Sequence, residues 1–291
     1  MEKVRMTLKI SNNDLDEYRK ELFNKILNDP NYKVLVKEGF SNEEIYKNVT
    51  KFDEFLEDLK IAQKIKTYDD CKAFNKFERI ILYRNGEIIE KQYIPLAPYQ
   101  DYLDNIKKFV IRDIPSGDEE AKWENLSQGL KRFISQKLKE NKWVYLYGAV
   151  RSGRSYAASA MTNRKYIKEC DSIAFINCPV RFKELSELYF KDSVYFKELM
   201  TEYSNVDYLV LDEFGSEYKN ELIRDSILIP LLKARITNKK ITSFTSDFKI
   251  DDVRKLYTFK KDNNTIMLEQ LMDLLQTNCG KEIVTSTLSI Y

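Results

Sequence analysis

A short glycine-containing loop between an apolar run and a helix-forming stretch constrains the fold more than any other feature of this sequence. The loop runs from Gly148 to Ser155 (GAVRSGRS) and follows the apolar run WVYLY at 143–147. Its pattern is that of the phosphate-binding motif G-x-x-x-x-G-K-[ST], whose backbone N–H groups surround phosphate oxygens. Arg154 stands where the motif has lysine, and arginine is planar and bulkier than lysine. For the loop alone, an ordinary glycine turn is the alternative.

The loop and the start of the following helix supply the predicted nucleotide contacts. The Ser155 hydroxyl is also the predicted Mg²⁺ ligand of this segment, because the motif uses its Ser or Thr for that purpose. The arginine at the lysine position could contact phosphates with two N–H groups or crowd the terminal phosphate. The predicted contacts with the nucleotide are Gly148, Ala149, Val150, Arg151, Ser152, Gly153, Arg154, Ser155 and Tyr156.

Two further apolar runs end in acidic residues. Asp212 and Glu213 follow the run at 208–211, with one predicted strand between them and the loop. We predict that Asp212 contacts the nucleotide and holds Mg²⁺, while Glu213 polarises the attacking water. Asp247 follows the run at 241–246 and could orient that water; the alternative is a helix cap. An apolar strand ending in Asp-Glu is common, so the combination with the loop is what indicates a nucleotide site.

Strands and helices alternate from Trp143 onward, which predicts an α/β domain with a parallel sheet flanked by helices. Before it, residues 8–66 are typical of helices, with a capping box expected at Ser41, and Asn85-Gly86 predicts a hairpin. Predicted helices lie at 126–140, 155–170, 181–190, 195–203, 220–236, 250–257 and 266–276, and predicted strands at 143–147, 172–178, 207–211, 241–246 and 282–290. The predicted domains are 1–98, mostly helical with a β-hairpin, and 126–291, joined by a linker at 99–125.

Composition excludes several classes of site. The chain has no histidine, and its four cysteines, at 71, 170, 178 and 279, lack metal-ligand spacing. Histidine catalysis is therefore excluded, a Cys/His zinc site is not expected, and the cysteines are expected to be buried. The net charge of +2 argues against a bulk polycation. With no apolar stretch of about 18 residues and no signal-like N-terminus, we expect a cytoplasmic location and no membrane contact.

The run VDYLVLDEFGSE at 206–217, the pair Arg224-Asp225, Arg235 and the run ITSFTSDF at 241–248 are similar to one family. They resemble the bacterial helicase loaders of the DnaI/DnaC type, which are AAA+ P-loop proteins of the primosome. The resemblance is good over 126–291 and looser over 1–98. It implies that the first domain binds the replicative hexameric helicase. It further implies that the AAA+ domain binds ATP or ADP with Mg²⁺, binds single-stranded DNA, can self-associate, and helps to deliver the helicase to the origin or fork.

The chain also departs from these loaders. Zinc is frequent in their first domain, whereas here Cys71 has no partner Cys or His, so no zinc is expected. The predicted helix 266–276 lacks the arginine that serves in the family as arginine finger, which suggests weak hydrolysis; Arg224, Arg235 or Arg254 could substitute, or the first two could form surface ion pairs. Candidate DNA contacts, equally typical of solvated helix faces, are Arg164, Lys165, Lys168, Arg181, Lys183, Tyr189 and Lys191. The alternative functions are a catalytically dead helicase-binding adaptor and a transposition ATPase of the IstB type.

Overall fold

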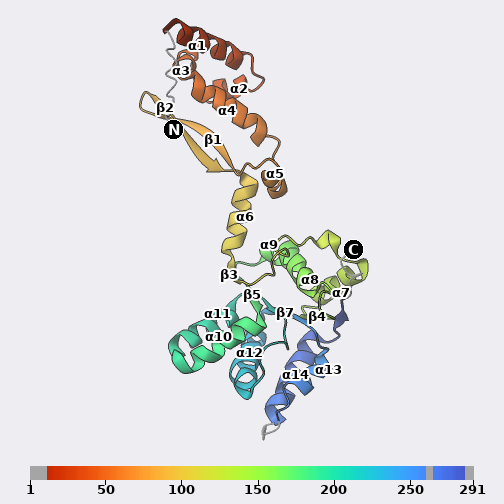
Figure 1. The fold of residues 1–291 in the computed structure, drawn as a ribbon. Helices are drawn as coiled ribbons and strands as arrows, with labels where there is room; N and C mark the ends of the chain where they lie inside the picture. The colour runs from red at the N-terminus through yellow and green to blue at the C-terminus, as the bar shows by residue number, and fades with distance from the viewer. Residues whose placement is uncertain (1–11, 260–264, 286–291) are drawn as a thin grey trace, which may run out of the picture. The chain divides into compact units, whose positions relative to one another are not determined.

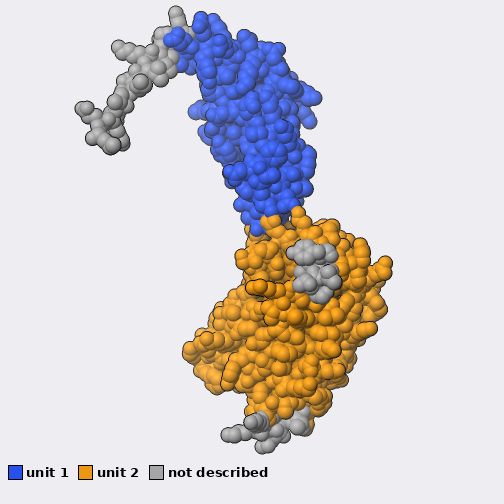
Figure 2. Space-filling view, turned by 45° about the vertical axis from the view of Figure 1, so that its right-hand side comes forward, with its two compact units in different colours: residues 1–104 blue, residues 105–291 orange. Residues whose placement is uncertain are grey.

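A computed structural model describes residues 12–259 and 265–285 of this chain. The chain divides into two compact units, residues 1–104 and 105–291, which Figure 2 colours separately. Each unit has its own buried apolar clusters, as expected of domains that can fold separately. Over the described residues, no helix has both the length and the apolar character needed to cross a membrane.

Short helices joined by capped turns make up most of the first unit. The hydroxyl of Ser41 accepts a hydrogen bond from the Glu44 N–H at 3.2 Å, and the Glu44 carboxylate accepts one from the Ser41 N–H at 2.8 Å. This reciprocal pair is the predicted capping box, which is confirmed. Leu35, Phe52 and Leu56 lie in the core of these helices. The helices are α1 (Asn12–Leu27), α2 (Tyr32–Lys37), α3 (Asn42–Lys47), α4 (Val49–Ala62) and α5 (Tyr68–Ala73) (Figure 1).

The predicted hairpin is also confirmed. Strands β1 (Glu78–Asn85) and β2 (Ile88–Pro95) are antiparallel, and Asn85 pairs with Ile88 across the turn. Gly86 has φ +61°, a left-handed value that glycine adopts without a steric penalty. Helix α6 (Ala97–Lys107) follows the hairpin (Figure 1).

The second unit is built on a parallel sheet. Over the described residues this sheet has six strands in the order β3-β5-β6-β7-β4-β8, and each neighbouring pair is parallel. Its strands are β3 (Phe109–Arg112), β4 (Val144–Tyr147), β5 (Ile173–Asn177), β6 (Tyr208–Asp212), β7 (Ile241–Ser246) and β8 (Ile283–Val284). Strand β3 lies inside the segment that we predicted as a linker. It is a four-residue edge strand, too short to show a strand pattern in the sequence.

Helices cover both faces of this sheet. Alternate strand residues point to opposite faces, so Tyr145, Leu211 and Phe244 join one buried cluster, while Leu146 and Val210 join the other. The first cluster includes residues of α10–α14, and the second includes residues of α7 and α8. The helices are α7 (Gln128–Lys139), α8 (Arg154–Met161), α9 (Ile167–Glu169), α10 (Cys178–Lys191), α11 (Ser193–Asn205), α12 (Ile229–Thr237), α13 (Ile250–Leu256) and α14 (Thr265–Cys279), with a 3-10 turn at Trp123–Asn125.

Two predicted long helices contain π-helical turns. Residues Thr162–Tyr166 separate α8 from α9, and residues Ile223–Leu228 precede α12. Pro230 therefore lies in the first turn of α12, where its missing N–H leaves no gap in the α-helical ladder, and not in the interior of one helix. The predicted strand at 282–290 is described only as far as residue 285, and residues 286–290 lie outside the described part of the chain.

Candidate nucleotide-binding site

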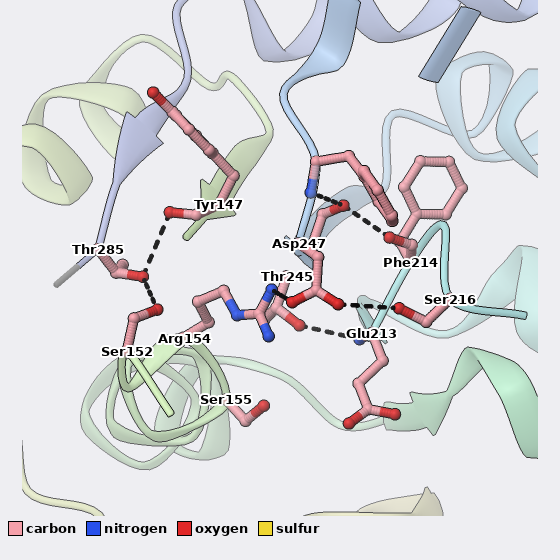
Figure 3. A network of polar contacts seen from close by, with 12 residues as sticks. Tyr147, Ser152, Arg154, Ser155, Glu213, Phe214, Ser216, Thr245, Asp247 and Thr285 are labelled. Atoms are coloured by element: carbon pink, nitrogen blue, oxygen red, sulfur yellow. Dashed lines mark hydrogen bonds and ion pairs between the residues drawn. The ribbon is translucent and has the colours of Figure 1, made fainter. Parts of the chain in front are cut away.

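The sheet order brings the predicted site residues to one edge. Strand β7 lies between β4 and β6, and all three are parallel, so their carboxyl ends meet. The loop 148–153 follows β4, Asp212 ends β6, and Asp247 follows β7. Figure 3 shows the Arg154 side chain, at the start of α8, pointing toward Asp247. In open parallel sheets, ligands bind at this edge.

The loop is held from behind by a residue that the sequence did not indicate. Thr285 donates its N–H to the Tyr147 carbonyl at 2.7 Å, and its hydroxyl lies 2.7 Å from the Ser152 hydroxyl (Figure 3). A Cβ on Gly148 would lie 2.5 Å from the Thr285 carbonyl oxygen, so only glycine fits there. Gly153 has φ +81° and leads into α8. The loop backbone is thus fixed by the sheet before any ligand enters it.

At the front of the loop, Ser155 and Asp212 are in direct contact. The Ser155 hydroxyl donates to Asp212 Oδ1 at 2.7 Å, and the Thr245 hydroxyl donates to the same oxygen at 2.6 Å. Asp212 is fully buried, and this burial raises its pKa above the ordinary value. Its other oxygen, Oδ2, is buried and has no hydrogen-bond partner among the described residues. A buried carboxylate oxygen without a donor is a natural ligand for a cation.

These residues fit Mg²⁺, which binds one or two protein oxygens together with phosphate oxygens and waters. Asp212 Oδ2 and the Ser155 hydroxyl would hold it. Within residues 12–259 and 265–285, no cluster of three or more His, Cys, Asp or Glu side chains could hold a metal by itself.

The Glu213 carboxylate is held at the end of β5. The backbone of Glu213 has φ +57°, and its N–H donates to the Thr245 hydroxyl at 2.9 Å. Its carboxylate accepts a hydrogen bond from Asn177 Nδ2 at 3.1 Å, at the end of β5. Any role in polarising water therefore requires the carboxylate to leave Asn177.

Arg154 does not extend freely into the loop. Its Nη1 forms an ion pair with Asp247 Oδ1, and the Ser216 hydroxyl lies 3.4 Å from Asp247 Oδ2 (Figure 3). Arg154, at which the loop departs from the usual lysine, therefore contacts the residue that directly follows β7.

An open cleft of about 1040 Å³ adjoins the loop and is large enough for a small-molecule ligand. Burial and the nearby charge of Asp212 raise the pKa of Asp118 at this cleft. The hydroxyl of Tyr156 accepts hydrogen bonds from the Lys122 N–H at 3.1 Å and from Asn125 Nδ2 at 2.8 Å. The predicted contacts Arg151, Gly153 and Tyr156 line it, whereas Val150 is 74% exposed. The other lining residues are Asp118, Glu124 and Asn125, in the segment assigned from sequence to a linker, and Leu126, Ser127, Gln128 and Lys131, at the start of the predicted second domain.

Comparisons with known proteins cover both the sequence and the fold. No protein-family model matches the sequence. The replicative helicase loader DnaI of Bacillus subtilis (strain 168) is 23% identical over 269 residues, covering 85% of this chain and 85% of that protein. A crystal structure of DnaI superposes with a TM-score of 0.53 and 20% identity, covering 62% of this chain and 98% of that one.

The chain resembles the DnaI-type helicase loaders. The resemblance predicted from the sequence is thus confirmed, and so is the predicted fold, an α/β domain with a parallel sheet flanked by helices, preceded by a mostly helical region with a hairpin.

Two of the arginines considered as arginine fingers in this DnaI-like chain are buried. This burial corrects the expectation that they act as fingers and the alternative expectation that they lie at the surface. Arg224 is 0% exposed and contacts the Asp225 carboxylate and the Tyr257 carbonyl. Arg235 is also 0% exposed, and burial lowers its pKa to about 9. Arg224 forms its ion pair with Asp225 from within the core, and neither arginine has an exposed side chain with which to contact a neighbouring subunit. Helical arginines usually face solvent, and only the packing of α12 against β7 and α11 shows that Arg235 does not. Arg254 is exposed and paired with Glu269.

Most of the candidate DNA contacts of this DnaI-like chain are paired with carboxylates. Arg181 binds Asp113 through two N–H groups, at 2.7 and 2.6 Å, and contacts Glu184 at 2.8 Å. The pairs Arg164–Glu124 (3.5 Å), Lys165–Glu169 (3.6 Å) and Lys191–Glu187 (3.1 Å) are more exposed. Arg181 therefore anchors α10 to the end of β3. Lys168 and Lys183 line surface clefts, and Tyr189 packs against Phe190 and Phe196.

Proposed function

We propose that this protein is a helicase loader whose second unit binds ATP or ADP with Mg²⁺. The observation that carries nucleotide binding is the Ser155–Asp212 contact beside a fixed glycine loop, with Asp212 Oδ2 buried and unpartnered. Backbone N–H groups of the loop and of the first turn of α8 would take the phosphates. Mg²⁺, held by Ser155 and Asp212, would neutralise phosphate charge. The adjoining cleft, lined by Tyr156 and Asp118, would take the nucleoside.

The loader role rests on the likeness to DnaI. The second unit makes up less than two thirds of the chain, so a likeness over 85% of the chain extends into the first unit. We propose that the first unit binds a replicative hexameric helicase. We propose further that the second unit binds single-stranded DNA through exposed lysines such as Lys168 and Lys183. We also propose that this unit self-associates, as the likeness to the loaders implies.

We further propose that hydrolysis is slow and that nucleotide acts mainly as a conformational switch. Arg224 and Arg235 are buried in this unit's own core, and α14 carries no arginine. A missing arginine finger lowers turnover by about 10³- to 10⁵-fold. Glu213, held by Asn177, would polarise water only after release, and Asp247 would orient water only if it left Arg154.

The test combines nucleotide titration with helicase capture. Calorimetric titration of the full chain with Mg·ADP should show binding, and Ser155→Ala should weaken it. Ser159→Ala, a buried serine further along α8, is the matched control and should bind as the wild type does. Absence of binding by the wild type would leave only the helicase-binding adaptor.

Co-elution with the replicative helicase of the source organism tests the loader role. Lack of co-elution, with or without nucleotide, would refute it. ATP turnover measured with helicase and single-stranded DNA present tests slow hydrolysis, and a rate typical of AAA+ motors would refute that part.

A further inference from the structure

An ion pair joins the two sides of the candidate site. Arg154 begins α8 directly after the loop, and Asp247 directly follows β7, the neighbour of the loop's own strand. The Arg154 side chain is 10% exposed and that of Asp247 is 32% exposed. The Arg154 side chain is therefore the more buried partner of the pair, and that of Asp247 is the more exposed one.

The guanidinium in this pair still has hydrogen-bonding capacity. Arg154 Nη1 is buried and contacts Asp247 Oδ1 in the ion pair. A guanidinium carries five N–H donors, so a phosphate oxygen could bind a donor that Asp247 does not occupy. Arg154 can thus meet one phosphate while remaining beside Asp247.

The carboxylate of Asp247 is held in place from its other side. Its Oδ2 lies 3.4 Å from the Ser216 hydroxyl, in the turn that follows Glu213. The end of β6 also carries Asp212 and Glu213, and burial raises the pKa of Asp212. The carboxylates of Asp212 and Asp247 thus border the loop, Asp212 through Ser155 and Asp247 through Arg154.

The γ-phosphate of a nucleoside triphosphate would approach these carboxylates. In the usual motif the lysine reaches the β- and γ-phosphates and is free to do so. Here the equivalent charge is shared with Asp247, so a γ-phosphate meets a fixed carboxylate at the point where it would otherwise meet an unshared cation. A diphosphate that ended at Arg154 would lack the phosphate that meets Asp247. Repulsion between a phosphate and a carboxylate at contact distance weakens binding by about tenfold or more, even when the charges are partly screened.

We propose that the Arg154–Asp247 pair makes this site select nucleoside diphosphate over triphosphate. The proposal rests on the nucleotide-binding function proposed above and names Asp247 as its specificity-determining residue. Triphosphate binds after the pair separates, which couples the occupancy of the γ-phosphate position to the turn 213–217 through Ser216.

The experiment compares dissociation constants for Mg·ADP and for Mg with a non-hydrolysable ATP analogue, measured by calorimetry on the full chain. The wild type should bind ADP about tenfold more tightly or better. Asp247→Asn should tighten binding of the analogue and bring the two constants within about threefold. Asp252→Asn, which removes a charge on α13 that is paired with Lys255, is the matched control and should keep the wild-type ratio.

The wild-type ratio needs no variant, so the proposal remains testable even if Asp247→Asn is unstable. Equal or tighter binding of the triphosphate analogue by the wild type would overturn the diphosphate preference. An unchanged ratio in a folded Asp247→Asn variant would overturn the role of Asp247. Binding of neither nucleotide would instead refute the proposed nucleotide site, so the two failures are distinct.

Discussion

Replacing Gly148 with alanine should destabilise the second unit even without any nucleotide. The new Cβ would lie 2.5 Å from the Thr285 carbonyl oxygen, 2.6 Å from Ser152 Oγ and 2.8 Å from Thr285 Oγ1. Separations below 3.0 Å require movement, and the first of these atoms belongs to the backbone. Moving residue 285 breaks its hydrogen bond to Tyr147 and its contact with Ser152. Overpacking and two lost hydrogen bonds together cost about 2–4 kcal/mol.

Tryptophan fluorescence during urea unfolding measures this cost. The two tryptophans of the sequence, Trp123 and Trp143, both lie in the second unit, so the signal follows that unit alone. Gly129→Ala is the matched control, because a Cβ there meets no atom within 4 Å and Gly129 lies in α7. That variant should be equally stable or gain about 0.5 kcal/mol. If Gly148→Ala unfolds within about 0.5 kcal/mol of the wild type, the close approach of residue 285 does not restrict the loop.

Three further outcomes are expected. Arg235→Leu should lower the free energy of unfolding by about 3 kcal/mol or more in the same fluorescence assay, because it leaves several buried oxygens without donors; a smaller loss would refute its structural role. Burial raises the pKa of Asp212 above 3.8, so the folded chain binds this proton more tightly than the unfolded chain, and stability falls as the pH rises through the folded pKa. Asp212→Asn should therefore be more stable than the wild type at pH 7, with a gain that shrinks as the pH is lowered toward 3.8; a constant gain would contradict this. Arg181→Ala should cost about 1.5–3 kcal/mol, with affinity for single-stranded DNA unchanged in a fluorescence-anisotropy titration.

Local patterns predicted the parts of the fold that depend on local chemistry. The capping box at Ser41 and the turn at Gly86 are encoded by adjacent residues, and both formed as expected. The loop at 148–155 and the acidic end of β6 followed from a glycine spacing and an apolar run. Strand β3 could not be predicted in this way, because its four residues become a strand only by pairing with β5.

The details of the candidate site depend on contacts between distant parts of the chain. Arg154 and Asp247 are far apart in sequence, and their contact follows from the insertion of β7 between β4 and β6. Thr285 gave no signal, since a threonine near a short strand is unremarkable until that strand is placed beside the loop. Arg235 was misjudged for the same reason, because nothing in a helical segment marks an arginine whose acceptors lie on other elements.

Strand β8 has a consequence for the order in which this protein is made. The hydroxyl contact between Ser152 and Thr285 spans 133 residues, and β4 has β7 on one side and β8 on the other. After residue 155 has been synthesised and before residue 285 emerges, the loop can leave the exit tunnel, but β8 is not yet there to pair with β4. Contacts of such long range form late and slowly. The loop backbone is therefore fixed only once residues 283–285 are available, so this part of the second unit reaches its final geometry last.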